Sequence, residues 1–292
     1  MVIGHILGGI GNQMFQYAAA RALSLSKEQP LYLDILDFDG YSLHSGFQLN
    51  TAFCLQTKLA DSELIRKILG FRNQQLIKKL IKRPLFKFLR GCNFIMEPHA
   101  HYWSQIESAP ENCYLYGYWQ SEKYFKAFEN VIRKDFSFRN SLDEYNTDLK
   151  SKIDETVSVS VHIRRGDYIS DSKTSQIMNV CGINYYKDAI NRIALQINSP
   201  HFYIFSDDMQ WVRENLNLSY SVTYVDHNFG KNSYIDMQLM SACKHNIIAN
   251  SSFSWWGAWL NLNPKKIVIA PSKWFVNSNN DSDVVPSSWI RI

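Results

Sequence analysis

The second half of the chain alternates between segments of two different hydrophobic periods. Residues 157–163 alternate apolar and polar side chains, the period of two that is typical of a strand. Four further segments are expected to be strands, at 202–206, 222–225, 246–249 and 267–270. Segments expected to be helices lie between them, at 184–197, 209–215, 234–243 and 253–260. Strands separated by helices favour right-handed crossovers and a parallel, doubly wound sheet, so we predict a Rossmann-like domain.

The first half opens with the same order of elements and then becomes less regular. We expect a strand at 2–7, a glycine-rich turn, a helix at about 12–26 and a second strand at 31–34. A polar stretch at 140–155 separates the two halves. We therefore predict an α/β protein with two domains, residues 1–150 and 151–292.

Composition supports an ordinary globular protein. The length of 292 residues suits two domains, and 46% hydrophobic with 14% aromatic residues excludes a disordered chain. A net charge of +4 gives no reason to expect nucleic-acid binding. The five cysteines are scattered and form no C-x-x-C pair, which disfavours a zinc ribbon or a secreted disulfide scaffold.

Targeting signals are also missing from the sequence. The N-terminal residues show no basic region ahead of an apolar stretch, so we expect no signal peptide. No run of about 18 apolar residues occurs, so we expect no membrane-spanning helix. The sequence therefore predicts a cytoplasmic protein.

One segment departs from the balanced charge of the chain. From Arg66 to Arg90 there are nine basic residues and no acidic residue. Four apolar residues recur there at helical spacing with four basic residues between them: Leu76, Ile77, Leu80 and Ile81, and Lys78, Lys79, Lys82 and Arg83. Pro84 then ends or breaks the helix. Two interpretations stay open, a helix packed on its own domain with a solvated basic face, or a surface that makes peripheral contact with a membrane.

The sequence GGIGNQ at residues 8–13 lies between the first expected strand and the first expected helix. Glycines there let backbone N–H groups approach an anion at a helix N-terminus. As a dinucleotide fingerprint the sequence fails at Met14, which stands where the third glycine is required. Asp34 ends the next strand and could bind a ribose, which keeps a nicotinamide- or flavin-dependent oxidoreductase as an alternative.

The sequence HIRRGDY at residues 162–168 follows the first strand of the second half. Alternation along that strand puts His162 and Arg164 on the face opposite the valines. Arg164 and Arg165 come at the carboxyl end of the strand, where doubly wound sheets bind ligands. Because a guanidinium offers fixed N–H donors that suit phosphate, this motif predicts an anion site rather than a surface charge cluster.

Polar groups follow two further strands of this half. Asp207 and Asp208 end one strand, where one could accept hydrogen bonds from a ribose or base and the other could cap the next helix. Ser251 and Ser252 end another strand and open a helix, whose N–H groups and hydroxyls suit phosphate. Three polar groups at strand ends of one sheet favour a diphosphate-bearing ligand. The helix then contains three tryptophans that we expect in the core: Trp255, Trp256 and Trp259.

Metal binding has weaker support in the sequence. Adjacent aspartates do not have the D-x-D spacing that holds a metal in many sugar-nucleotide enzymes. The pairs Asp37/Asp39 and Asp281/Asp283 have that spacing, but both lie among turn-forming residues. We therefore predict no metal site.

Together these motifs resemble the α-1,2-fucosyltransferases of glycosyltransferase family 11. The resemblance extends over nearly the whole chain, in GGIGNQMFQYAAA (8–20), GYWQSEKYF (117–125), HIRRGDY (162–168), FSDDMQW (205–211), SACKHNIIANSSFSWWGAWL (241–260) and PSKW (271–274). The arginine motif and the serine–tryptophan motif are highly specific, and the glycine turn is less so. Residues 41–90 and 170–182 match no family motif, which leaves acceptor choice the least defined property.

The resemblance implies a GT-B fold, in which two Rossmann-like domains face each other across a cleft. It implies an inverting, metal-independent transfer of L-fucose from GDP-β-L-fucose to O2 of a terminal galactose on a glycan. GDP-fucose is then a substrate, and no cofactor is needed. The process implied is lipopolysaccharide or O-antigen biosynthesis. Residues 1–150 would form the acceptor-side domain and residues 151–292 would bind GDP-fucose.

The resemblance also assigns residues to the site. Arg164 would bind the diphosphate and act in catalysis, with Arg165 and Asp167 supporting it. His162 and Asp207 would lie near the nucleoside. The remaining donor contacts would be Ser251, Ser252 and Phe253 at the phosphates, and Gly11, Asn12 and Gln13 from the N-terminal domain.

The general base and the exact activity stay open at this point. Asp167 and Asp171 are both candidates for the base, and a water relay is a third option. Fucosyltransferases of other linkage, α-1,6 or protein O-linked, are alternatives within the class. A glycan-binding protein without catalysis is a further alternative, although it would not need two arginines at the end of a strand.

Overall fold

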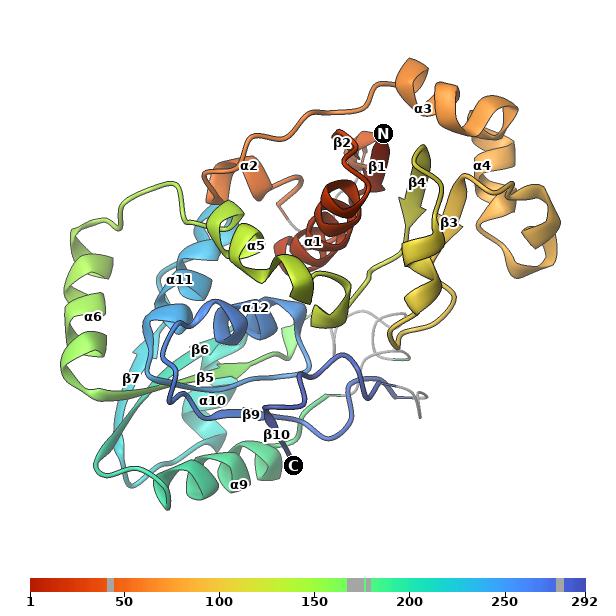
Figure 1. Ribbon diagram of the computed structural model, residues 1–292. Coiled ribbons are helices and arrows are strands. Elements are labelled where there is room, and N and C mark those ends of the chain that lie inside the picture. Colours follow the sequence, from red (N-terminus) through yellow and green to blue (C-terminus); the bar gives the residue numbers. More distant parts are fainter. Residues whose placement is uncertain (41–44, 167–175, 177–179, 277–280) are drawn as a thin grey trace. The chain divides into compact units, whose positions relative to one another are not determined.

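The computed structural model describes residues 1–40, 45–166, 176, 180–276 and 281–292. These residues form two compact units, Met1–Arg139 and Asn140–Ile292, which we call the N-terminal and C-terminal units (Figure 1). The chain thus divides between Arg139 and Asn140, not at the predicted 150/151. The reason is helix α6 (Glu144–Glu155), which buries Leu149 and Ile153 in a hydrophobic cluster of the C-terminal unit.

The N-terminal unit is built on a parallel sheet with the strand order β2-β1-β4-β3. Its strands are β1 (Val2–His5), β2 (Leu31–Asp34), β3 (Phe94–Met96) and β4 (Cys113–Tyr116). Helix α1 (Ile10–Ser26) connects β1 to β2, as predicted. A Cβ at Gly4 would lie 2.8 Å from the Cβ of Ala20, so glycine at this position lets α1 pack directly on β1.

Short helices complete the N-terminal unit. The α-helices are α2 (Leu49–Ala52), α3 (Ser62–Leu69), α4 (Gln75–Ile81) and α5 (Glu129–Asp135). The 3₁₀ helices are η1 (Leu36–Phe38), η2 (Gly70–Asn73), η3 (Pro84–Leu89), η4 (Ser104–Ser108), η5 (Glu122–Tyr124) and η6 (Lys126–Phe128). Pro84 opens η3 directly after α4, because proline suits the first turn of a helix and not its interior.

The C-terminal unit contains a larger parallel sheet with the order β10-β9-β8-β5-β6-β7. Its strands are β5 (Val157–Ile163), β6 (Pro200–Ser206), β7 (Ser221–Val225), β8 (His245–Ile247), β9 (Val268–Ala270) and β10 (Ile290–Arg291). Besides α6, its helices are α9 (Ile183–Ala194), α10 (Met209–Asn215), α11 (Tyr234–Ala242), α12 (Ser252–Leu260) and the 3₁₀ helix η7 (Gly230–Asn232). Each strand and helix predicted for this half is present, with bounds that differ by at most three residues.

Helices cover both faces of the larger sheet. Val159, Val161 and Ile163 of β5 pack against α9 and α10 in one hydrophobic cluster. Tyr203 and Phe205 of β6 pack against α6 and α11 in another. Counted from β5 in chain order, the strands lie in the sequence 3-2-1-4-5-6, which is the Rossmann order. The strand order reverses direction between β5 and β8, and ligands of such folds bind beyond the carboxyl ends of the strands at that point.

Both units are therefore parallel α/β layers, as the sequence predicts. That the two units face each other across a cleft stays a prediction. No helix among the described residues is both long and apolar enough to cross a membrane.

Candidate functional site

The C-terminal unit brings three predicted motifs to one edge of its sheet. Strand β5 pairs with β8 on one side and with β6 on the other, and all three run parallel. The residues that follow β5, β6 and β8 therefore meet at the same carboxyl edge, beside the point where the strand order reverses. They are His162 to Gly166 at the end of β5, Asp207 and Asp208 after β6, and Asn250 to Phe253 after β8.

Asp207 holds the turn that follows β5. Its Oδ1 accepts a hydrogen bond from the backbone N–H of Arg165 at 2.9 Å, and its Oδ2 accepts one from Gly166 at 3.1 Å. Its Oδ2 also lies 2.9 Å from Nη1 of Arg164. A Cβ at Gly166 would lie only 2.7 Å from that oxygen, so the close approach requires glycine. Asp207, predicted near the nucleoside, thus positions the arginine that is predicted to bind phosphate, together with its turn.

Arg165 is enclosed more tightly than its neighbour. Its Nε donates to Oδ2 of Asp208 at 3.1 Å, and its guanidinium carbon lies 3.7 Å from the ring centroid of Trp211. Asp208 also caps α10, since its Oδ1 accepts the backbone N–H of Trp211. This arrangement agrees with a supporting role for Arg165 and with the capping role foreseen for one of the two aspartates.

His162 lies inside the unit at the same edge. Only 5% of the residue is exposed, and its ring centroid lies 5.6 Å from that of Phe253. Burial lowers the pKa of the imidazole to about 4, opposed by the charge of Asp207 and assisted by that of Arg164. His162 is therefore neutral at pH 7. Its Nδ1 is buried and has no hydrogen-bond partner among the described residues, which is uncommon for a buried polar atom.

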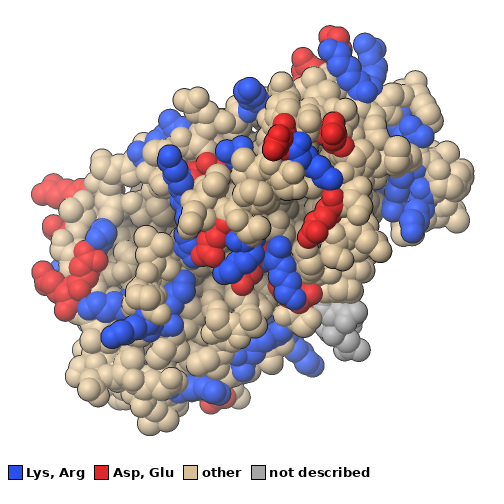
Figure 2. All heavy atoms as spheres, in the orientation of Figure 1, with Lys and Arg blue, Asp and Glu red and all other residues tan. Residues whose placement is uncertain are grey.

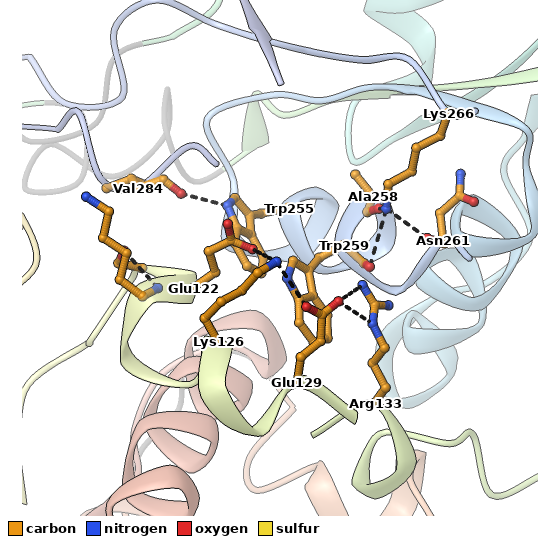
Figure 3. A network of polar contacts seen from close by, with 12 residues as sticks. Glu122, Lys126, Glu129, Arg133, Trp255, Ala258, Trp259, Asn261, Lys266 and Val284 are labelled. Carbon is orange, nitrogen blue, oxygen red and sulfur yellow. Dashed lines mark hydrogen bonds and ion pairs between the residues drawn. The ribbon is translucent and has the colours of Figure 1, made fainter. Parts of the chain in front are cut away.

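Helix α12 points its N-terminus at this edge and is secured at both ends. Ser251 caps it, with its Oγ accepting the backbone N–H of Phe253 at 3.3 Å. At the other end, Nζ of Lys266 donates to the backbone oxygens of Ala258 and Asn261, each at 2.7 Å (Figure 3). A cation at the C-terminus complements the helix dipole, and the opposite end favours an anion.

The tryptophans of α12 belong to the core, as predicted. Trp255, Trp256 and Trp259 are each at most 2% exposed. Figure 3 shows the indole Nε1 of Trp255 donating to the backbone oxygen of Val284, at 2.7 Å. Their role is to fix the position of α12 in the unit, and they offer no platform for a sugar.

The glycine-rich turn of the N-terminal unit is held by its own side chains. Gly8 has φ of +88°, a conformation that favours glycine. Gln13 is fully buried, and its Nε2 donates to the backbone oxygens of Gly8 and Gly46, both at 2.8 Å. Its amide therefore links two loops within the unit. Asn12 accepts a hydrogen bond from Gln120 at 2.8 Å and is only partly buried, and Gly11 is buried in the first turn of α1.

Glu97 is a residue that the sequence reasoning missed. It follows β3, and its two carboxylate oxygens accept backbone N–H groups of Tyr118 at 2.6 Å and Trp119 at 2.9 Å. Trp119 has φ of +56°, a strained value for a bulky residue. Burial raises the pKa of Glu97 to about 7. The available signal was its place directly after a strand, at the same sheet edge as the glycine turn.

Asp34 and Asp37, which were considered for a ribose and for a metal, already have protein partners. Asp34 is fully buried and accepts from Nζ of Lys78 at 2.9 Å and from the hydroxyl of Tyr114 at 2.6 Å. Asp37 lies 2.9 Å from Nε2 of His5 and 3.3 Å from Nζ of Lys82. Asp34 therefore offers no open acceptor to a ribose, which removes the structural basis of the oxidoreductase alternative. The described residues contain no group of three or more His, Cys, Asp or Glu side chains arranged to hold a metal.

The candidates for the general base, Asp167 and Asp171, lie outside the described residues. The same applies to Tyr168, the last residue of the arginine motif. Their roles stay predictions.

A Rossmann sheet with an arginine and a capped helix N-terminus at its switch point is typical of nucleotide-binding α/β proteins. The chain belongs to glycosyl transferase family 11, whose family model matches residues 88–292. The resemblance stated from the sequence motifs is thereby confirmed, and the protein is a glycosyltransferase.

Two bacterial relatives match the full length of the chain. An Alpha-1,2-colitosyltransferase of Escherichia coli is 35% identical over 300 residues, covering 100% of this chain and 99% of the relative. The O-antigen biosynthesis glycosyltransferase WbnK of Escherichia coli is 34% identical, covering 98% of each chain. A more distant relative is the Galactoside alpha-(1,2)-fucosyltransferase 2 of Sus scrofa, 24% identical over 87% of this chain and 68% of its own.

A solved structure supports the fold. The NodZ alpha-1,6-fucosyltransferase, in a crystal soaked with GDP-fucose, matches with a TM-score of 0.55 and 16% identity. The match covers 89% of this chain and 91% of that one. The chain therefore has the GT-B-type fold that the sequence predicts.

Proposed function

We propose that the protein transfers L-fucose from GDP-β-L-fucose to O2 of a terminal β-galactoside, with inversion at the anomeric carbon and without a metal. One observation carries the proposal. Arg164 is fixed by Asp207 at the end of β5, next to the strand β8 that leads into the capped N-terminus of α12. A cation and a helix N-terminus at one switch point suit a diphosphate.

In the proposed reaction, the acceptor O2 attacks C1 of fucose from the face opposite GDP. The bond between C1 and the β-phosphate oxygen breaks, and its electron pair stays on the phosphate. Negative charge therefore develops beside Arg164, whose guanidinium cannot lose its proton. A fixed donor aimed at developing charge contributes roughly 3–4 kcal/mol to the transition state, by analogy with oxyanion sites. This charge is what a metal would otherwise supply.

The proton of the acceptor hydroxyl must leave as the new bond forms. We assign it to Asp167 or Asp171, directly or through a water molecule. Asp167 also stands beside Arg164 and Arg165 in the sequence, which supports its part in catalysis. Neutral His162 and Phe253 are proposed to contact the nucleoside or the phosphates, together with Ser251 and Ser252.

A second donor deserves the same test, because one of the full-length relatives is named as a colitosyltransferase. Colitose is L-fucose without its 3-hydroxyl. A site built to hydrogen-bond that hydroxyl rejects the deoxy sugar by roughly 10⁴-fold, whereas an apolar site accepts both. The bacterial relatives also support an O-antigen glycan as the acceptor.

A cytoplasmic reaction is part of the same proposal. All five cysteines are free thiols, as a reducing compartment requires. GDP-activated sugars and the glycan acceptor would then meet on the cytoplasmic side.

The test is a donor and acceptor panel. The protein is incubated with GDP-fucose or GDP-colitose and with a β-galactoside or a matched β-glucoside, with and without EDTA, and GDP release is followed. We expect EDTA-resistant release that needs both GDP-fucose and the galactoside, with an α-1,2 linkage in the product by NMR. Preference for GDP-colitose would reassign the donor. Loss of activity in EDTA that Mg²⁺ or Mn²⁺ restores would contradict the metal-independent mechanism.

A further inference from the structure

Helix α4 of the N-terminal unit presents two different faces. Ile77 and Ile81 face inward, where Ile81 is fully buried in a cluster with β3 and β4. Leu76 and Lys79 fall on the opposite side of the helix and are exposed, with Leu76 at 77%. Arg83, two residues beyond the end of α4, is exposed as well. Of the four apolar residues at helical spacing, only Leu76 is exposed, whereas Ile77 and Leu80 are half-buried and Ile81 is buried.

Ion pairs on the inward face explain how α4 is oriented. Lys78 reaches the buried carboxylate of Asp34 at 2.9 Å, and Lys82 reaches Asp37 at 3.3 Å. Each ammonium also lies over a tyrosine ring of β4. Two lysines thus anchor α4 to the sheet. Arg90 helps to hold the next segment, donating to the backbone oxygen of Ile81 at 2.9 Å.

Three other basic residues of this segment are exposed to solvent. Lys79, Arg83 and Lys87 are exposed, and no ion pair is formed by any of them within the described chain. No Asp or Glu occurs between residues 64 and 96. Figure 2 shows Lys and Arg side chains without acidic neighbours at the end of the N-terminal unit where Figure 1 draws α4.

Large apolar side chains are exposed in the same stretch of the chain. Besides Leu76, Leu85 is 80% exposed and Phe88 is 79% exposed. Both belong to the 3₁₀ segment η3, which is kinked at Phe86. Single exposed apolar residues occur on many surfaces. Three of them within thirteen residues, among cations that form no ion pair, are instead typical of a surface that binds a partner.

We propose that this patch, formed by Leu76, Lys79, Arg83, Leu85, Lys87 and Phe88, docks onto the anionic surface of a lipid bilayer. The unpaired cations match negatively charged headgroups, and the exposed leucines and phenylalanine enter the boundary with the acyl chains. The ion pairs of Lys78 and Lys82 hold α4 on the sheet, so the patch is already ordered before it contacts the membrane. This inference does not depend on the donor or the acceptor of the enzyme.

The test is co-sedimentation of the full-length protein with vesicles. Vesicles of phosphatidylcholine with phosphatidylglycerol are compared with vesicles of phosphatidylcholine alone, at low and at high salt. We expect binding to the anionic vesicles at low salt, and its loss at high salt because ions screen the attraction. Absence of binding to anionic vesicles at low salt would overturn the proposal, as would pelleting of the protein without vesicles.

Charge is tested with a variant that spares the anchoring lysines. Lys79/Arg83/Lys87→Gln should bind about 100-fold more weakly, since each basic residue near an anionic surface is worth about fivefold. Lys152/Lys187/Lys265→Gln changes the net charge equally on exposed positions of the C-terminal unit. An equal loss in this control would show a nonspecific charge effect and overturn the proposal.

The apolar contribution has its own pair of variants. Leu76/Leu85→Gln should reduce vesicle binding by about tenfold or more, because the variant loses the free energy gained when two leucine side chains move from water into the bilayer. Leu195/Leu262→Gln, at leucines exposed by 88% and 77% elsewhere, should change nothing. Unaltered binding of Leu76/Leu85→Gln would overturn the claim that side chains enter the bilayer. Transfer to a water-soluble acceptor should stay unchanged in all four variants.

Discussion

Asp207 and Arg164 show how much of a site depends on contacts between residues far apart in the sequence. Residue types at strand ends are sufficient to predict an anion site. They do not reveal that Asp207 accepts from Arg165, Gly166 and Arg164, because those contacts link residues 41 to 43 positions apart. The same limit hid Glu97, whose partners lie 21 and 22 residues away.

His162 gives a prediction about pH at this scale. Its pKa is about 4 in the folded protein, because it is buried, against about 6.5 in an unfolded chain. Between these values the unfolded state binds the proton more readily, so the free energy of unfolding falls as the pH drops from 7 to 4. This group accounts for about 3 kcal/mol of that fall.

The measurement is denaturant unfolding of the wild type and of His162→Gln at several pH values. The variant should lose this part of the pH dependence, whatever its stability at pH 7. His99→Gln, at an exposed histidine, is the control and should keep the slope of the wild type. Equal slopes in all three proteins would contradict a buried, neutral His162.

At the scale of elements, the C-terminal unit was predictable and parts of the N-terminal unit were not. The alternation along β5 and the helical pattern of α10 are local in the sequence, so both elements were predicted with their observed bounds. In α4 and directly after it, two of the four basic residues expected on a solvated or membrane-facing surface, Lys78 and Lys82, instead point inward to Asp34 and Asp37, more than 40 residues earlier. Local hydrophobicity cannot report such ion pairs.

Helix α6 leads to a prediction about where the C-terminal unit begins. Asp143 caps this helix, and Asn146 is buried and hydrogen-bonded to Asn228 at 3.1 Å. A fragment of residues 140–292 should therefore unfold cooperatively. A fragment of residues 151–292 lacks the cap and buried Leu149, and it should be less stable by roughly 3–6 kcal/mol.

Thermal unfolding followed by near-UV circular dichroism compares the two fragments. Near-UV signal reports fixed packing of the many buried aromatic residues of this unit. Equal melting temperatures would mean that α6 is not part of the unit, and would favour the boundary at 150/151 predicted from the sequence.

At the scale of the whole molecule, the fold class and the family followed from motifs that are spread along nearly the entire chain. A parallel sheet in each half, short connections and polar strand ends are local features, and together they predicted a two-unit α/β protein. The acceptor could not be predicted in the same way. Residues 41–90 and 170–182 match no family motif, so the sequence offers no pattern from which to predict the acceptor.

The most direct test of the central claim is the rate of fucosyl transfer when Arg164 is changed. kcat/KM for transfer from GDP-fucose to a β-galactoside is measured for the wild type, Arg164→Ala, Arg164→Lys and the exposed control Arg192→Ala. We predict a fall of roughly 10²–10³-fold for Arg164→Ala, since one donor to the developing phosphate charge is lost. Lysine should restore little, because a point charge cannot make bidentate contacts, and Arg192→Ala should match the wild type. Near-normal transfer by a folded Arg164→Ala protein would contradict the assignment of the diphosphate site to the end of β5.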